Sequence, residues 1–111
     1  MTVTAKNLVP AKIVEATQTT QYTANGVTTI IDKFTATNFS ASTATISVNF
    51  VTLAGAAGNL NLITKEKSLS PAEVYTFPEL VGQIIPPGGF ISTIAGTGSA
   101  INMRVSGREI S

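Results

Sequence analysis

The sequence predicts an all-β fold, an antiparallel β-sandwich with seven to eight strands. Short runs rich in Val, Ile, Thr and Phe recur along the 111 residues, and Gly, Pro, Asn and Ser separate them. Turn signals at intervals of about 8 to 12 residues are typical of sandwiches, and we expect the jelly-roll type. A chain of this length buries about 65 % of its unfolded surface, enough for one core without disulfides.

The N-terminal residues 1–12 differ from the rest, because they contain Pro10 and two lysines and show no sustained alternation. We expect them to form an extended arm, either ordered by adding a strand to a neighbouring molecule or simply frayed. Residues 13–111 are expected to form a single β-sandwich domain.

One or two short strands are expected at the start of this domain, within residues 13–23. The pair Asn25-Gly26 is typical of a tight β-turn. It is therefore expected to fold residues 21–23 back towards residues 27–29.

Two β-rich runs, residues 28–38 and 43–53, flank the polar link Phe39-Ser40-Ala41-Ser42 and predict a central antiparallel hairpin. In the second run, Ile46, Val48 and Phe50 alternate with polar residues and are expected to face the core. The first run alternates less cleanly, with Asp32 set among apolar residues. Its expected faces are Ile30, Phe34 and Ala36 on one side, and Ile31, Thr35 and Thr37 on the other.

The C-terminal half begins with a loop at residues 55–59, which has two glycines and no anchoring side chain. We expect either a flexible connection or a loop pressed against another surface. The elements expected after it are strands at residues 60–68, 74–77, 90–95 and 99–109, with a single helical turn at residues 78–81. In the last strand, Ile101, Met103 and Val105 are expected to point inward.

The charge content of the chain is low. Charged residues make up 12 % and hydrophobic residues 43 %, whereas about 25 % charge is usual for soluble domains. The exterior must therefore consist largely of Thr, Ser, Asn, Gln and Ala, which favours a protein whose surface is covered in an assembly. The alternative is a small free β-domain with a Thr-rich surface, because strands favour Thr.

Composition also argues against several partners. Seven basic and six acidic residues are scattered almost singly, so no basic stripe exists for phosphates and we expect no nucleic-acid partner. No segment approaches about 18 consecutive apolar residues, and the N-terminus lacks the pattern of a signal peptide. We therefore expect no membrane partner and no export.

The residues needed for most catalytic and metal sites are absent. The chain has no His and no Cys, which excludes Ser-His and Cys-His nucleophiles and zinc sites built on these ligands. A carboxylate pair for glycoside hydrolysis would also need aromatic walls, and the aromatic residues here are expected in the core. The six carboxylates are Glu15, Asp32, Glu66, Glu73, Glu79 and Glu109. We predict no enzyme, with no catalytic, cofactor-binding or metal-binding residues and no cofactor.

Two local features have structural interpretations. Gly96-Thr97-Gly98 precedes a strand and has no following Lys, so we expect a hairpin turn and not a phosphate loop. Asp32 within an apolar run is expected to form an ion pair with Lys33, Arg104 or Arg108.

Three segments between residues 28 and 110 carry a distinctive pattern: TTIIDKFTATNFSASTATISVNFV, SLSPAEVYTFPELVGQIIPPGGFI and STIAGTGSAINMRVSGREI. This pattern resembles a family of small structural proteins of tailed bacteriophages, and it is most similar to the short capsid staple or cement proteins of epsilon15-like podoviruses. The matching positions are Ile30, Ile31, Lys33, Thr37, Asn38 and Ser40 in the first segment; Ser68, Leu69, Pro71, Glu73, Tyr75, Pro78, Glu79, Leu80, Val81, Gly82, Gln83, Pro87, Gly88, Gly89 and Ile91 in the second; and Asn102, Arg104, Ser106, Gly107, Glu109 and Ile110 in the third. Ala72 stands where the family often has Gly.

The resemblance implies a virion structural protein with a jelly-roll-like sandwich. It implies a capsid decoration protein, or staple, that sits on the outer surface of the icosahedral head and clamps neighbouring major capsid proteins. Such a protein is made in the bacterial host cytoplasm and pairs with a second copy, as a homodimer at two-fold positions. Two alternatives stay open: a tail or head-fibre component of the virion, and a carbohydrate-binding β-sandwich module.

Overall fold

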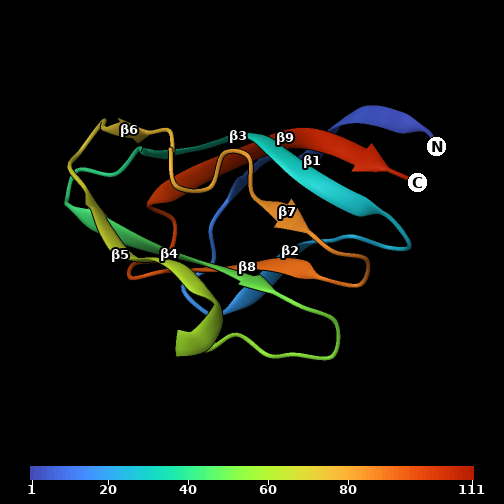
Figure 1. The fold of residues 1–111 in the computed structure, drawn as a ribbon. Helices are drawn as coiled ribbons and strands as arrows, with labels where there is room; N and C mark the ends of the chain where they lie inside the picture. Colours follow the sequence, from blue (N-terminus) through green and yellow to red (C-terminus); the bar gives the residue numbers. More distant parts are fainter.

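The computed structural model describes all residues from 1 to 111 and contains nine β-strands and one short 3-10 helix (Figure 1). The elements are β1 (Val3–Ile13), β2 (Thr19–Thr23), β3 (Thr28–Asn38), β4 (Ala44–Val51), η1 (Asn59–Asn61), β5 (Leu62–Leu69), β6 (Val74–Tyr75), β7 (Ile84–Ile85), β8 (Phe90–Ala95) and β9 (Ile101–Ile110). The prediction of an all-β fold is confirmed. The strand count exceeds the predicted seven to eight because the N-terminal segment forms the strand β1, and because the two-residue strand β7 was not predicted.

The strands form two antiparallel sheets. The first sheet has the order β1-β9-β3-β6, with β7 also paired to β3, and the second sheet has the order β2-β8-β4-β5. Figure 1 shows the two sheets as layers, with the N- and C-termini side by side at one end of the first. Thr2 and Ser111 exchange two backbone hydrogen bonds of 3.1 and 3.0 Å, which join the two ends of the chain.

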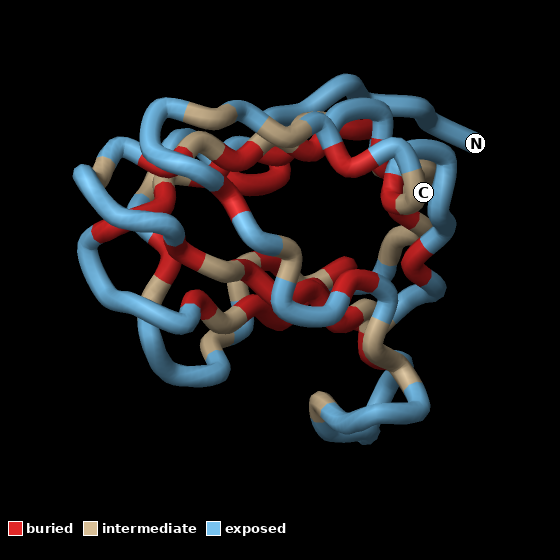
Figure 2. Tube along the Cα trace, turned by 90° about the vertical axis from the view of Figure 1, so that its left-hand side faces the viewer, coloured by how far each residue is buried: buried red, intermediate tan, exposed pale blue.

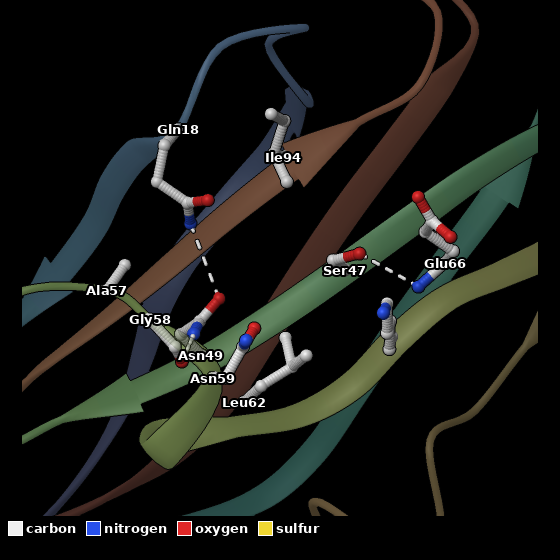
Figure 3. A pocket seen from close by; sticks show the side chains of 10 residues that line it. Gln18, Ser47, Asn49, Ala57, Gly58, Asn59, Leu62, Glu66 and Ile94 are labelled. Atoms are coloured by element: carbon white, nitrogen blue, oxygen red, sulfur yellow. Dashed lines mark hydrogen bonds between the residues drawn. The ribbon is translucent and has the colours of Figure 1, made fainter.

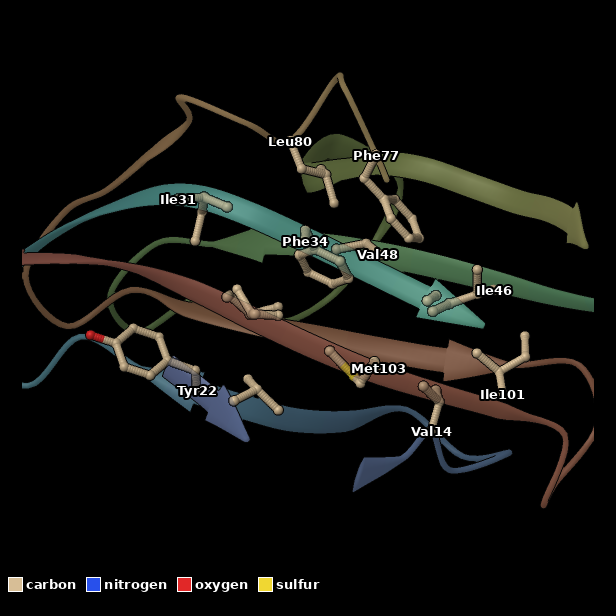
Figure 4. Packing of buried hydrophobic residues seen from close by; sticks show 14 of the residues in the cluster. Val14, Tyr22, Ile31, Phe34, Ile46, Val48, Phe77, Leu80, Ile101 and Met103 are labelled. Atoms are coloured by element: carbon tan, nitrogen blue, oxygen red, sulfur yellow. The ribbon is translucent and has the colours of Figure 1, made fainter. Parts of the chain in front are cut away.

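One hydrophobic core lies between the sheets, because each sheet turns the apolar side of its alternating strands towards the other. Twenty-one buried residues form a single cluster, to which both sheets contribute (Figure 4). In Figure 2 the buried segments of the two layers face each other and the exposed segments lie outside. The predicted inward residues Ile46, Val48, Ile101, Met103 and Val105 are all buried, and Phe50 is partly buried against the cluster.

The strands β3 and β4 do not form the predicted hairpin. β3 lies in the first sheet beside β9, whereas β4 lies in the second sheet between β8 and β5, so the link between them crosses from one layer to the other. Asn38 fixes this crossing with a fully buried side chain. Its Nδ2 donates to the carbonyl oxygens of Ser42 and Leu69 at 2.8 and 2.9 Å, and its Oδ1 accepts from the Ser40 backbone N–H at 2.9 Å.

The turn at Asn25-Gly26 makes a second crossing. β2 and β3 belong to different sheets, so the predicted return of residues 21–23 onto residues 27–29 is also wrong. Gly26 has a φ of 69°, the left-handed conformation that glycine adopts without strain. The expected turn is therefore present, but it connects the two layers.

A β-bulge explains the irregular alternation of β3. The register with β9 shifts between Ile31 and Lys33, so that Asp32 and Lys33 are both exposed. The alternation of inward and outward residues therefore shifts by one position at the bulge. The predicted assignment of residues to the two faces of this strand is wrong. The residues buried on its inner side are Ile31, Phe34 and Ala36.

The N-terminal segment predicted as an arm forms the edge strand β1. It pairs with β9 from Val3 opposite Ile110 to Ile13 opposite Asn102. Leu8 is 6 % exposed, which anchors the middle of the strand, whereas residues 3–7 are all exposed. The segment is extended, as predicted, but it adds a strand to its own sheet.

Residues 76–83 form a strap that connects β6 to β7 and covers one side of the core (Figures 1 and 4). Phe77 and Leu80 are fully buried, and the Phe77 ring centroid lies 4.7 Å from that of Phe34. The Gly82 N–H donates to the Ile31 carbonyl at 2.7 Å, which ties the strap to β3. The predicted helical turn at residues 78–81 lies in this strap as a non-helical turn.

Candidate functional site: the uncharged face of the second sheet

Charged residues are distributed unevenly between the two sheets. Residues 16–31, 34–64 and 80–103 contain no Asp, Glu, Lys or Arg. These intervals include all of β2, β4 and β8, so three of the four strands of the second sheet carry no charge. The outer side of this sheet is therefore the most neutral surface that the topology creates.

We call this surface the uncharged face and define it by its residues. The side chains of β4 and β8 that alternate with core residues point away from the core and form its centre, together with Gln18. The loop of residues 52–61 borders it on one side. The central residues are Gln18, Thr45, Ser47, Asn49, Ser92 and Ile94.

Asn49 is the centre of a hydrogen-bond network on the uncharged face, and Figure 3 shows its contact with Gln18. It is 3 % exposed, and its Nδ2 donates to Asn61 Oδ1 at 2.8 Å and to the Gly58 carbonyl at 3.0 Å. Gln18 Nε2 donates to Ser92 Oγ at 2.8 Å and approaches Asn49 Oδ1 at 3.5 Å. No buried side-chain nitrogen or oxygen is left without a partner.

The loop of residues 52–61 is held in place by this network. Asn61 Nδ2 donates to the Ala56 carbonyl at 2.9 Å, and Asn61 Oδ1 accepts from the Gly58 N–H at 3.1 Å. The loop is therefore anchored by side chains. These anchors are Asn49 and Asn61, which lie outside residues 55–59, where no anchoring side chain was found in the sequence. Between these anchors, Leu60 is fully exposed, and Leu53 is 72 % exposed.

The depressions in the surface are small or shallow. One of about 160 Å³ lies between the uncharged face, at Gln18, Ser47 and Asn49, and the charged residues Lys65 and Glu66 of β5 (Figure 3). Its volume is below the roughly 300 to 1,000 Å³ of ordinary ligand pockets. Two larger ones are shallow and each contains one carboxylate, Asp32. The one of about 380 Å³ is lined by six residues of the first sheet, and the one of about 430 Å³ by five residues of β3 and the strap. This relief suits contact with a broad surface better than enclosure of a small molecule.

Asp32 pairs with Arg108, one of its three predicted partners. Arg108 Nε and Nη2 donate to the two carboxylate oxygens at 3.0 to 3.2 Å. Both side chains are 45 % exposed, and such solvated pairs contribute about 0 to 1 kcal/mol. The arrangement is a surface ion pair beside the β-bulge.

Glu79 binds two hydroxyl groups from different sheets. It accepts hydrogen bonds from Thr64 Oγ1 of β5 at 2.6 Å and from Tyr75 Oη of β6 at 2.7 Å. Burial alone raises the pKa of this carboxyl group, but the bonds from Thr64 and Tyr75 outweigh burial, and the pKa is lowered. Glu79 thus links the strap to both sheets by hydrogen bonds.

Glu109 accepts a hydrogen bond from Tyr22 Oη at the end of the sandwich where the termini meet. Burial and this bond raise the pKa of the Tyr22 phenol to about 12. Lys6 Nζ lies 3.4 Å from Glu109. The chain has no group of three or more His, Cys, Asp or Glu residues that could hold a metal ion.

Several of the matching positions between residues 28 and 110 have structural roles. Asn38 fixes the crossing between β3 and β4, Glu79 pins the strap, and Gly82 has a φ of 86° where the strap turns. These residues therefore stabilise the crossing between the two sheets and the strap. None of the central residues of the uncharged face is among these matching positions. The face was not predicted as a site, although the long charge-free intervals were a visible signal.

No helix is long and apolar enough to span a membrane.

No family model, curated protein or solved structure matches this chain at a significant level.

Proposed function

We propose that this chain is a virion structural protein, a decoration or staple protein on the outer surface of an icosahedral phage head. It clamps neighbouring major capsid proteins and stabilises the shell. The observation that carries this proposal is the uncharged face, a neutral surface with exposed leucines on a chain that has little charge. The resemblance of residues 28–110 supplies the identity of the partner.

The uncharged face has the physical properties of a surface that is covered. Its central residues carry no charge whose desolvation would oppose contact, and the nearest charges, Lys65 and Glu66, lie at its border on β5. Its buried amides and hydroxyls already bond to each other, so covering them leaves none unpaired. Contact would bury the exposed apolar area of Leu53 and Leu60, and this burial favours binding by about 25 cal/mol per Å². A staple needs such a surface, of about 800 Å² per partner, in place of a pocket.

We also infer that the sandwich is of the jelly-roll type. If the two-residue strand β7 is set aside, eight strands remain, and their pairing is nested. The first pairs with the last (β1 with β9), the second with the seventh (β2 with β8), the third with the sixth (β3 with β6) and the fourth with the fifth (β4 with β5). One long hairpin rolled into two layers produces this order, which supports a jelly roll, an architecture found in viral capsid proteins.

Copy number in purified phage particles tests the proposal. If the protein covers the head, its band in a quantitative gel should lie within a few-fold of the major capsid protein. A few copies per particle would instead indicate a tail or head-fibre component. Absence from virions would remove the structural proposal and favour a separate binding module, such as one for carbohydrates.

A pair of matched variants tests the surface. Leu60→Asp places a charge at a fully exposed position of the loop, so the fold should be unaffected. If the uncharged face docks on the capsid, this variant should co-sediment with undecorated heads about tenfold or more weakly, as expected for an interface anchor. Val74→Asp, at a 54 % exposed position of the first sheet, is the control and should bind normally. Equal binding of both variants would place the contact elsewhere.

A further inference from the structure

The turn between β2 and β3 carries two reactive groups that no hydrogen bond holds. Asn25 and Gly26 are both exposed. The Gly26 N–H donates no hydrogen bond, and the Asn25 side-chain amide has no partner either. A bond between the Gly26 nitrogen and Asn25 Cγ would close a five-membered ring. Such a ring closure within one chain is fast because the two groups are already held near each other.

The backbone next to this turn is fixed by hydrogen bonds. Ala24 is fully buried, its N–H donates to the Gly89 carbonyl at 2.8 Å, and its carbonyl accepts from the Gly88 N–H at 2.7 Å. On the other side, Thr28 begins β3. Figure 1 shows the turn beside the one that joins β7 and β8. The fold therefore anchors both ends of the turn and leaves Asn25 and Gly26 in solvent.

The nitrogen of Gly26 is unhindered. A side chain on the residue after an asparagine shields the backbone nitrogen of that residue, and glycine has none. A Cβ atom built on Gly26 would meet nothing within 4 Å, so no other part of the molecule covers this position. Glycine also adopts more backbone conformations than other residues, which allows its nitrogen to approach Asn25 Cγ.

The other six asparagines lack this combination. Each is followed by Leu, Phe or Met, whose side chain hinders the backbone nitrogen. Two of them, Asn38 and Asn49, are also buried, and hydrogen bonds fix their side chains. The six residues are Asn7, Asn38, Asn49, Asn59, Asn61 and Asn102.

We propose that Asn25 is a site of spontaneous modification, at which the chain deamidates through a cyclic imide. The Gly26 nitrogen attacks Asn25 Cγ and forms a new C–N bond. The bond from Cγ to the side-chain nitrogen breaks, and ammonia leaves with the proton of the Gly26 N–H. Asparagine is among the thermolabile residues of proteins.

Water then opens the imide at one of two C–N bonds. Cleavage at the former side-chain carbonyl gives Asp, whereas cleavage at the main-chain carbonyl gives isoaspartate, in which the backbone runs through the former side chain. Neither step changes an oxidation state, and water is the only co-reactant.

The modification changes both charge and backbone at this crossing. Residues 16–31 contain no charged side chain, and a carboxylate at position 25 lowers the formal net charge of the chain from +1 to zero. Isoaspartate also lengthens the backbone between β2 and β3. Gly88 bonds to Ala24 and lies against the Leu53 side chain, so the new charge arises at the same end of the sandwich as Leu53.

Peptide mapping of purified protein incubated at pH 7 and at pH 9 tests the site. Trypsin cleaves after Lys12 and Lys33, and the peptide of residues 13–33 contains Asn25 and no other asparagine. In mass spectrometry, Asn25 should convert to its acid form at least about tenfold faster than any other asparagine. The rate should rise with pH, because the Gly26 nitrogen attacks after losing its proton. Equal conversion of another asparagine, or an unmodified Asn25, would overturn the proposal.

The identity of the product tests the cyclic route. Direct hydrolysis of the side-chain amide gives Asp alone, whereas opening of the imide gives isoaspartate together with Asp. We therefore expect both products in the peptide of residues 13–33, and a product without isoaspartate would contradict the proposal. The reaction needs no partner, so this experiment is independent of capsid binding.

Matched variants identify the two reacting groups. Asn25→Gln keeps an exposed amide but would require a six-membered ring, and Gly26→Ala places a methyl group beside the attacking nitrogen. Both should lower the rate of conversion at position 25 at least about tenfold, and thermal unfolding checks that each variant is folded. Asn59→Gln changes another exposed asparagine and should leave the conversion of Asn25 unchanged. Conversion of Asn25→Gln at the wild-type rate would exclude the cyclic imide.

Discussion

The two sheets share one core but differ in how their outer sides hold polar groups. On the first sheet the polar groups are charges in solvent-exposed pairs, such as Asp32 with Arg108 at 45 % exposure each. On β4 and β8 of the second sheet they are neutral amides and hydroxyls, and Ser47, Asn49 and Ser92 are only 8, 3 and 2 % exposed. The difference matters because burying a neutral, satisfied group costs far less than burying a charge. Covering the neutral strands of the second sheet would therefore cost less free energy than covering the charged outer side of the first sheet.

The largest effect on stability should come from the neutral network. Asn49→Ala removes the donor to Asn61 Oδ1 and the Gly58 carbonyl, leaving acceptors unpaired beneath the loop of residues 52–61. We expect the free energy of unfolding to fall by about 1 to 3 kcal/mol, the cost of unsatisfied buried polar groups. Urea denaturation measures this change, and faster hydrogen exchange in the loop should accompany it.

Asn102→Ala is the matched control for this variant. Asn102 is a half-buried residue of β9 in the first sheet, and its side chain makes no hydrogen bond. Asn102→Ala should lower the free energy of unfolding clearly less than Asn49→Ala does. If the two variants lose the same stability, the network on the second sheet has no special role.

A smaller effect should come from Glu79, which connects the two sheets through Thr64 and Tyr75. Its pKa lies below the ordinary value of 4.5, so its ionised form is favoured in the folded state. The resulting stability is fully present above pH 4.5 and is lost as the pH falls through the lowered pKa. Glu79→Gln should therefore lower the free energy of unfolding by about 1 kcal/mol at pH 7, and the difference should shrink towards pH 3.

Urea titrations of wild type and Glu79→Gln between pH 7 and pH 3 measure this dependence. Glu66→Gln is the control, because the exposed Glu66 side chain makes no hydrogen bond. A Glu79→Gln deficit that stayed constant down to pH 3 would show that ionisation of Glu79 does not stabilise the fold.

The sequence predicts where the strands lie better than it predicts which strands pair with one another. The bounds of β8, residues 90–95, and the inward residues of β4 and β9 followed from alternation, because alternation reports which side of a strand is buried. It does not report which strand lies alongside. The alternation in β3 and β4 is compatible with two arrangements: a hairpin within one sheet, or two strands in different sheets joined by a crossing link. The contacts of Asn38 with Ser42 and Leu69 distinguish these arrangements.

The uncharged face was harder to predict for a related reason. Low charge indicated a covered surface, but the location of that surface depends on which strands share a sheet, and that pairing was not predicted. The anchors of the loop, Asn49 and Asn61, are 12 residues apart in sequence. Likewise, the bulge at Asp32 requires the register with β9. Each of these features depends on contacts between distant parts of the chain.

The smallest effect should come from the ion pair of the first sheet, and salt sharpens the comparison. Asp32→Asn weakens the exposed pair with Arg108 and should lower the free energy of unfolding by about 0 to 1 kcal/mol at low ionic strength. In 1 M NaCl this loss should disappear, because screening then acts over about 3 Å. The loss caused by Asn49→Ala should persist in the same salt, since its hydrogen bonds join neutral groups. A salt-independent loss for Asp32→Asn would mean that the carboxylate supports the β-bulge through its shape and not through its charge, and the two sheets would then be stabilised in the same way.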